Sequence, residues 1–280
     1  MTINNEIPSL RILPIKKLQI HELHDNHRTS RLVERLRYDG VLRNPIIVTP
    51  LRDRKGHYVV LDGANRFSAL RKMGSYHILT QVVEPDDPNL KLHSWSHVVW
   101  ENAIDLLLNC IRKLPSLELQ WIDEARERQD LYYKHILFRI YLTEGENMSV
   151  SVNGVDFMQR IDLLNSVVDS YIGRAAIERT NLQALKPVTK QYSKASGLVV
   201  FPRFTIEEIL HLAMTGQRLP AGITRFSISP RGLRLNYPLT ELEVDKSLSE
   251  KNAFLKEWIH SKITNLSVRT YTEATVLFDE

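Results

Sequence analysis

The segment Leu61–Arg66 has the residue types and spacing for phosphate chemistry. It reads Leu-Asp-Gly-Ala-Asn-Arg and joins a short apolar run to a stretch with helical spacing. Backbone N–H groups at the start of a helix attract anions, and Gly63 lets an anion approach them closely. Arg66 adds a charged fork, and the Asp62 carboxylate is an oxygen ligand of the kind that Mg²⁺ prefers. These features together indicate a phosphate site.

A structural interpretation of the same segment stays open at this point. A tight turn between a strand and a helix also explains it, with Asp62 or Asn65 capping the helix. The spacing matches neither a P-loop nor a Rossmann fingerprint. Residue types alone therefore leave both interpretations standing.

Short strands and helices must position this segment. Apolar residues near helical spacing predict helices, and short β-branched runs between polar turns predict strands. The first hundred residues therefore alternate short elements, in this order: a helix through Leu32 and Leu36 that ends at Gly40, strands at 46–48 and 58–61, a helix from Asn65 to Gly74, and a strand at 78–83.

Beyond residue 100 the pattern becomes mainly helical and then mixed. Apolar residues recur every three or four positions over 157–172 and predict an amphipathic helix. Capping boxes predict two further helix starts, at Thr205 and at Ser247. Residues 268–278, rich in Thr, Val and Tyr, predict a terminal strand.

Length and composition limit the class of protein. A chain of 280 residues is expected to form about two domains, and 43% hydrophobic with 25% charged residues is typical of a globular protein. We find no apolar run long enough to span a membrane and no secretion signal at the N-terminus. Cys110 is the single cysteine, which excludes an internal disulfide. We therefore expect a cytoplasmic protein without membrane contact.

Positive charge is concentrated near the N-terminus. Residues 1–100 carry a net charge of +5 and residues 101–280 a net charge of −1, and seven of the ten histidines lie in the first hundred residues. A modest excess of this size suits a phosphate-bearing small molecule as well as a nucleic acid.

Three N-terminal motifs and two C-terminal motifs carry a resemblance to a known family. Pro14–Glu22, Gly40–Val48 and Val60–Leu70 together look like the ParB/sulfiredoxin fold. Leu219–Phe226 and Tyr271–Glu273 are similar to the free L-serine kinases of this fold, most of all to the branch of kinases and regulators that accompanies staphyloferrin B siderophore biosynthesis. The resemblance covers about residues 10–280.

This resemblance implies an α+β fold and a kinase. Residues 1–100 would form a ParB/sulfiredoxin-like nucleotide-binding domain, and residues 101–280 a helical-plus-strand domain that closes over the amino acid. The implied reaction converts free L-serine to O-phospho-L-serine, with ATP or ADP as donor and Mg²⁺ as cofactor, and supplies 2,3-diaminopropionate for siderophore biosynthesis.

The resemblance also assigns site residues. Glu22, in the His21-Glu22 motif, would take the proton of the serine hydroxyl, and Asp62 would act in catalysis and hold the metal. The implied nucleotide and phosphate contacts are Arg43, Gly63, Ala64, Asn65 and Arg66. The implied serine contacts are Trp95, His97, Thr224 and Arg225.

The family pattern is not matched everywhere. Asn65 stands where the family has a histidine, so no role of that histidine in phosphoryl transfer carries over. Sulfiredoxin chemistry is excluded because Ala64 occupies the position of its nucleophilic cysteine.

Two other functions remain as alternatives. A ParB-like, DNA-binding regulator of a siderophore gene cluster would use the N-terminal positive charge, although we find no helix-turn-helix with a basic recognition helix. Haem or metal sensing would use His21, His24 and His27, which are spaced by three residues. A homodimer is a further possibility.

Overall fold

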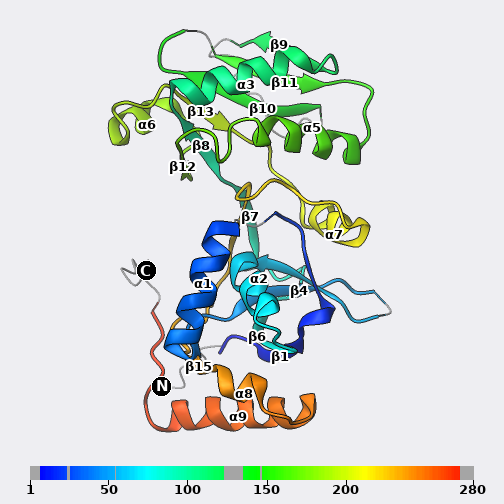
Figure 1. Cartoon of the computed structure of the whole chain (residues 1–280), viewed down its shortest axis with the longest axis vertical. Coiled ribbons are helices and arrows are strands. Elements are labelled where there is room, and N and C mark those ends of the chain that lie inside the picture. The colour runs from blue at the N-terminus through cyan, green and yellow to red at the C-terminus, as the bar shows by residue number, and fades with distance from the viewer. Residues whose placement is uncertain (1–6, 24–25, 54, 123–134, 146, 272–280) are drawn as a thin grey trace.

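The computed structural model describes residues 7–23, 26–53, 55–122, 135–145 and 147–271, without the side chains of residues 26–28. Figure 1 shows two lobes stacked along the long axis of the molecule, with β7 and α7 between them. The lower lobe contains the first six strands, and the C-terminal helices α8 and α9 lie at its base (Figure 1). The upper lobe contains β8 to β13.

In the lower lobe, the helices and strands predicted over residues 32–83 are confirmed in their predicted order, and the structure adds three short strands and a 3₁₀ turn that were not predicted. The N-terminal elements of this lobe are β1 (Leu10–Pro14), a 3₁₀ turn (Ile15–Lys17), β2 (Leu18–Ile20), α1 (Asn26–Asp39), β3 (Val41–Leu42), β4 (Ile46–Pro50), β5 (Tyr58–Asp62), α2 (Ala64–Lys72) and β6 (His77–Val82). Gly40 follows α1 with φ 65°, as expected for a residue that ends a helix. The five-stranded sheet has the order β1-β6-β4-β5-β2.

The upper lobe contains more strands than the sequence pattern predicted. Its elements are β7 (Lys91–Ser94), β8 (Ser96–Val99), α3 (Glu101–Lys113), β9 (Leu117–Trp121), β10 (Ile136–Leu142), β11 (Met148–Val152), α5 (Phe157–Asp169), β12 (Ile177–Thr180), α6 (Leu185–Gln191), β13 (Gly197–Val200) and α7 (Ile206–Thr215). An antiparallel sheet of order β12-β8-β13-β10-β11-β9 dominates this lobe. The prediction of a mainly helical segment after residue 100 holds for α3 and α5 but misses this sheet.

The chain then returns to the lower lobe. Its last elements are β14 (Thr224–Ser227), β15 (Tyr237–Pro238), α8 (Leu239–Glu243) and α9 (Leu248–Thr264). Both predicted capping boxes are confirmed, at Thr205 and at Ser247. Residues 268–271 form no strand, which corrects that part of the predicted terminal strand, and residues 272–278 lie outside the described residues. The mixed α+β class is confirmed.

The hydrophobic cores join segments that are far apart in the sequence. Tyr237, Leu242 and Leu255 are buried in the same cluster as Ile12 and Leu79 of the lower sheet. The predicted division into residues 1–100 and 101–280 stays a prediction, but the lower core draws on both parts. None of the helices in the described part of the chain has the length and apolar character needed to cross a membrane.

Candidate active site

Glu22 and Asp62 lie at the same edge of the lower sheet. β2 and β5 run parallel, and their last paired residues are Ile20 and Val60. Glu22 and Asp62 each follow two residues later, so both residues lie where these neighbouring strands end. The sequence predicted both residues for chemistry, and the parallel pairing brings them to one edge.

The helix after Asp62 starts without a capping side chain. Gly63 is the N-cap of α2, with φ 93°, and no side chain accepts a hydrogen bond from the first turn. By contrast, Asp156, Thr205 and Ser247 cap α5, α7 and α9. The capping interpretation is therefore wrong for Asp62 and Asn65. The first N–H groups of α2, at Ala64 and its neighbours, retain the geometry of an anion site.

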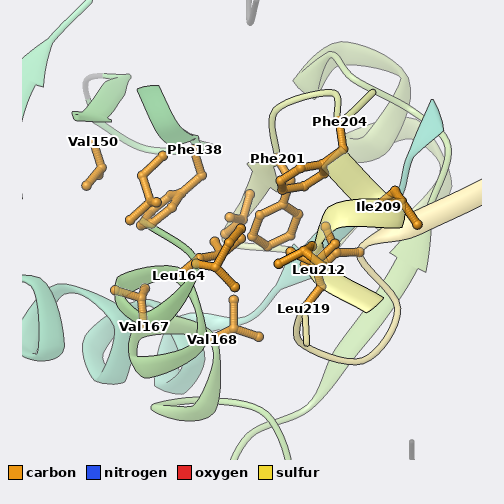
Figure 2. Packing of buried hydrophobic residues seen from close by; sticks show 14 of the residues in the cluster. Phe138, Val150, Leu164, Val167, Val168, Phe201, Phe204, Ile209, Leu212 and Leu219 are labelled. Atoms are coloured by element: carbon orange, nitrogen blue, oxygen red, sulfur yellow. The ribbon is translucent and has the colours of Figure 1, made fainter. Parts of the chain in front are cut away.

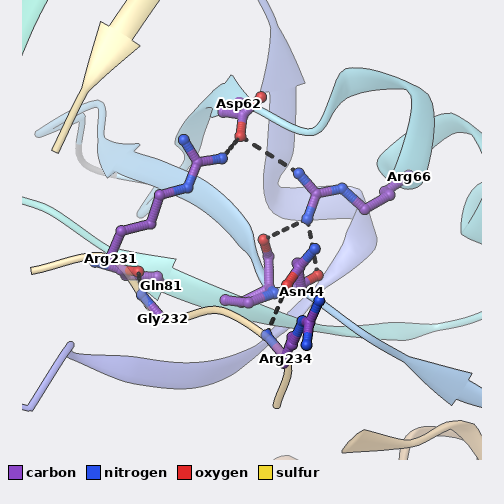
Figure 3. A network of polar contacts seen from close by, with 8 residues as sticks. Asn44, Asp62, Arg66, Gln81, Arg231, Gly232 and Arg234 are labelled. Atoms are coloured by element: carbon purple, nitrogen blue, oxygen red, sulfur yellow. Dashed lines mark hydrogen bonds and ion pairs between the residues drawn. The ribbon is translucent and has the colours of Figure 1, made fainter. Parts of the chain in front are cut away.

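Asp62 is held by two arginines. Arg66 Nη2 lies 3.3 Å from Asp62 Oδ2, and Arg231 donates to the same oxygen (Figure 3). Arg66 Nη1 also donates to the carbonyls of Asn44 and Pro45, both at 2.9 Å. Arg66 is thus fixed against the 44–45 turn rather than presented as an open fork.

Arg231 was not predicted from the sequence. It lies in a loop whose backbone is anchored to the lower lobe, since Gly232 N donates to Gln81 Oε1 at 2.9 Å and Arg234 N donates to Asn44 Oδ1 at 2.8 Å (Figure 3). The sequence of residues 230–234, Pro-Arg-Gly-Leu-Arg, indicates a basic loop. It does not indicate which part of the protein this loop contacts.

Two other predicted phosphate residues, Arg43 and Asn65, contact residues other than Asp62. Arg43 Nη2 pairs with Asp39 Oδ2 at 3.0 Å, at the end of α1. Asn65 Oδ1 accepts from the Thr29 hydroxyl at 3.4 Å. A phosphate role for either side chain stays a prediction.

A loop from the upper lobe encloses the Glu22 carboxylate. The backbone N–H groups of Gly222 and Ile223 donate to it at 3.0 and 3.1 Å, and both the N–H and the hydroxyl of Thr224 donate to Oε1. Preorganised donors of this kind hold a carboxylate in one orientation. Thr224, predicted from the C-terminal motif, therefore meets Glu22 directly.

His21 also contacts Thr224. It is buried, its Nδ1 donates to the Val60 carbonyl at 2.8 Å, and its Nε2 lies 2.9 Å from Thr224 Oγ1. The Thr224 hydroxyl, which donates to Glu22, thus lies within hydrogen-bond distance of both Glu22 and His21. Burial lowers the pKa of His21, with the Glu22 charge acting in the opposite direction. Because both ring nitrogens are engaged, His21 is a poor metal ligand; His24 and the side chain of His27 lie outside the described residues.

The upper core anchors the start of this loop. Leu219 is fully buried among Phe201, Leu212 and Leu164, as Figure 2 shows. Its backbone N–H donates to the His21 carbonyl at 2.8 Å, and its carbonyl accepts from Leu23 N at 2.9 Å. The loop that encloses Glu22 is thereby tied to both lobes.

Arg179 fixes the middle of the same loop. Its Nη2 donates to the Ala221 carbonyl at 3.0 Å, and its guanidinium lies so close to Gly222 that a Cβ there would overlap it. Gly222 has φ 77°, which other residues rarely adopt. Neither residue was singled out in the sequence, because β12 carries Arg179 to the loop only in the folded chain.

Trp95 and Arg225 lie side by side next to Thr224. β14 pairs with β7, which sets Thr224 opposite Ser94 and Arg225 opposite His93. The Arg225 guanidinium sits 5.3 Å from the Trp95 ring centroid, a cation–π distance. The structure thus brings Glu22, Trp95, Thr224 and Arg225 together where the lobes meet.

His97 lies in the core behind the loop. It is fully buried, its Nδ1 is 2.9 Å from the Tyr171 hydroxyl, and its ring packs edge-on against Phe201. Burial, with the Arg179 charge nearby, lowers the pKa of His97 to about 3. A direct contact with an amino acid stays a prediction that this burial does not favour.

The low pKa of His97 predicts a loss of stability in mild acid. An unfolded chain binds a proton on His97 below about pH 6.5, whereas the folded chain stays neutral there until about pH 3. The free energy of unfolding should therefore fall by about 1.4 kcal/mol per pH unit below pH 6.5 through this residue. His97→Gln should flatten that slope in urea unfolding curves between pH 7 and pH 5. His260→Gln, on the exposed side of α9, should leave it unchanged; equal slopes in all three proteins would contradict the assignment.

The donor set at Asp62 fits a magnesium ion carried by a nucleotide. Both arginine contacts fall on Oδ2, so neither arginine occupies Oδ1. Mg²⁺ is commonly held by one or two carboxylates together with phosphate oxygens and water. The described residues contain no cluster of three or more His, Cys, Asp or Glu side chains that would hold a metal without such a ligand.

Solved structures with the same fold identify the class of protein that this chain resembles. The chain has the fold of the free serine kinases: it superposes on a free serine kinase in complex with AMP with a TM-score of 0.68, at 16% identity, over 86% of this chain and 97% of that one. It also superposes on a C-terminally truncated SbnI from Staphylococcus aureus with a TM-score of 0.70, at 24% identity, over 91% of this chain and 97% of that one.

Particular relatives are also found by sequence. The chain is 26% identical to the ATP-dependent L-serine kinase SbnI of Staphylococcus aureus over 97% of both chains. It is 32% identical to an ATP-dependent L-serine kinase of Staphylothermus marinus over 43% of this chain and 45% of that protein. No protein-family model matches the chain. The resemblance predicted from the motifs is confirmed by these similarities.

Proposed function

We propose that this chain is an ATP-dependent kinase that phosphorylates the hydroxyl of free L-serine. The observation that carries the proposal is the placement of Glu22 and Asp62 at one sheet edge, beside the uncapped N-terminus of α2. A base and a phosphate site must lie side by side for phosphoryl transfer to an alcohol. The named serine kinases similar to this chain support the same reaction.

The two carboxylates have different roles in the proposed reaction. Glu22 accepts the proton of the serine hydroxyl as its oxygen attacks the γ-phosphorus of ATP; the new O–P bond forms while the bond to the β-phosphate oxygen breaks, and ADP leaves. The N-terminus of α2, with Gly63 and Ala64, binds the phosphates. Asp62 holds Mg²⁺, which when bound neutralises phosphate charge.

The serine substrate is held by the junction of the lobes. The Arg225 guanidinium, stacked on Trp95, binds the serine carboxylate in a bidentate fashion. The Thr224 loop keeps the Glu22 carboxylate oriented toward the hydroxyl. ATP and a single cysteine, Cys110, both suit a cytoplasmic enzyme.

A direct assay tests the function. Purified protein with ATP, Mg²⁺ and L-serine should yield O-phosphoserine, detected by mass spectrometry, with a parallel reaction containing ADP to identify the donor. L-Threonine and L-homoserine should be run beside L-serine, because one methylene changes selectivity by only about 1–3 kcal/mol. No product with either nucleotide would remove the proposal.

Arg231 should contribute to nucleotide binding through Asp62. Arg231→Gln removes one of the two guanidinium groups on the carboxylate, so we expect about tenfold weaker ATP binding with an unchanged KM for serine. Calorimetric titration of ATP measures the first and a rate series the second. Arg269→Gln, an exposed arginine distant in sequence, is the matched control; identical affinities in the two variants would speak against this role.

The regulatory alternative and the homodimer stay predictions, as does the use of phosphoserine in siderophore biosynthesis. The N-terminal positive charge is the feature that favours DNA binding. Gel-shift assays over a salt series would distinguish sequence-specific binding from binding through charge alone, which disappears near physiological salt. Light scattering of the purified protein would measure its oligomeric state.

A further inference from the structure

A cavity lies in the lower lobe, away from Glu22 and Asp62. Its volume is about 1020 Å³, and it opens between the 3₁₀ turn Ile15–Lys17, the C-terminal end of α2 and the α8–α9 connection. The cavity reaches Phe67 and Arg71 of α2, whereas Gly63 caps the start of this helix. Its lining includes none of Glu22, Asp62, Gly63 and Thr224, so it is distinct from the candidate active site.

A buried lysine lines this cavity. Lys251 of α9 is only 4% exposed, and its Nζ donates to the Leu242 carbonyl at 2.6 Å and lies 3.2 Å from His77 Nδ1. Neither partner carries a negative charge, because burial and the Lys251 charge lower the pKa of His77 and keep its imidazole neutral. Buried charges in proteins are normally paired with an opposite charge. Lys251 therefore brings a positive charge to the cavity that its two neighbours leave uncompensated.

Three further cations surround the opening. Lys16, Arg71 and Lys246 are exposed and line the same cavity. Arg71 lies over the Phe67 ring at 5.2 Å and Lys246 over the Phe254 ring at 5.8 Å, so aromatic faces hold both. Two carboxylates, Glu243 and Asp245, also line it, which leaves the cations in excess.

The remaining lining defines the shape of a ligand. Since His77 Nδ1 faces the Lys251 ammonium, its proton is on Nε2, which adds a hydrogen-bond donor. The hydroxyl-bearing Ser75 and Tyr76 belong to the same lining. Leu18, Phe67 and Leu248 add apolar side chains to it. Donors and positive charge combined with apolar side chains match a molecule with an anionic group and an apolar body.

From these contacts we infer that the cavity bounded by Lys16, Arg71, His77, Lys246 and Lys251 is a second ligand site, which binds a small organic phosphate. The phosphate group contacts the ammonium and guanidinium groups, and the organic part packs against Leu18 and Leu248. The site is separate from the proposed kinase centre and does not depend on that proposal.

The imidazole signals of His77 in NMR spectra provide a local test. They are assigned by their loss in His77→Gln, and phenyl phosphate and inorganic phosphate are titrated as probes. Both should raise the pH at which His77 titrates, because a bound anion offsets the Lys251 charge. Phenyl phosphate should bind about tenfold more tightly than inorganic phosphate, because its ring covers apolar side chains of the lining.

Matched variants separate this site from general charge. Lys16→Gln combined with Arg71→Gln should weaken phenyl phosphate binding at His77 about tenfold. Lys72→Gln removes the neighbouring cation of α2, whose ammonium faces the Ser30 hydroxyl instead, and should leave binding unchanged. Both variants alter exposed side chains, so folding is expected to be retained and is checked by circular dichroism. His77 signals that ignore both probes, or equal weakening by the two variants, would overturn the inference and leave Lys251 as a cap of α8.

Discussion

Glu22→Gln should reduce serine phosphorylation by about 10²- to 10⁴-fold, the usual range for loss of a general base. A glutamine amide cannot accept the serine proton at neutral pH. Nucleotide affinity should stay within about twofold, because the nucleotide elements at Gly63 and Asp62 are contributed by β5 and α2. Phosphoserine formation by mass spectrometry and calorimetric titration of ADP measure the two quantities.

Glu22 also orders the 222–224 loop, so a second variant must separate the two roles. Thr224→Val removes only the hydroxyl that contacts Glu22 and His21, and keeps the carboxylate. One lost hydrogen bond corresponds to about 1 kcal/mol, or about a fivefold lower rate. If Thr224→Val were as inactive as Glu22→Gln, loop order rather than proton transfer would explain both results. A Glu22→Gln enzyme with more than a tenth of the original rate would exclude Glu22 as the base.

Gly222→Ala should damage both stability and activity. The new Cβ would overlap the Arg179 guanidinium, and φ 77° is unfavourable for alanine. We expect a loss of about 1 kcal/mol from the backbone and about 1–3 kcal/mol from the overlap. The rate should fall about 100-fold, because the displaced loop no longer aligns its N–H donors with Glu22. Thermal unfolding and the serine kinase assay measure these effects.

Gly216 offers a control with the same backbone conformation. It ends α7 with φ 80°, and a Cβ there would meet no atom within 4 Å. Gly216→Ala should therefore cost about 1 kcal/mol of stability and leave the rate unchanged. If the two glycine variants behaved alike, contact with Arg179 would have no part in holding the loop.

The local features of the fold could be predicted because their causes lie within a few residues. The β5–Gly63–α2 segment follows from an apolar run, a glycine with positive φ and a helical stripe. The capping boxes at Thr205 and Ser247 depend on side chains three residues from the backbone groups that they bind. By contrast, β1 to β3 and β7 to β15 were not predicted, because short strands are stabilised by partner strands whose pairing the sequence does not reveal.

In the candidate site, too, local features could be predicted and long-range contacts could not. The sequence by itself determined that Asp62 follows an apolar strand, whereas Glu22, Thr224 and Arg225 were predicted only from motifs that resemble a known family. Only the tertiary structure decided that β2 and β5 run parallel, that Arg231 reaches Asp62 across 169 positions, and that Arg179 requires glycine at position 222. Such contacts depend on how strands and loops from distant parts of the chain pack against one another. Residue type and spacing describe only what each short segment prefers.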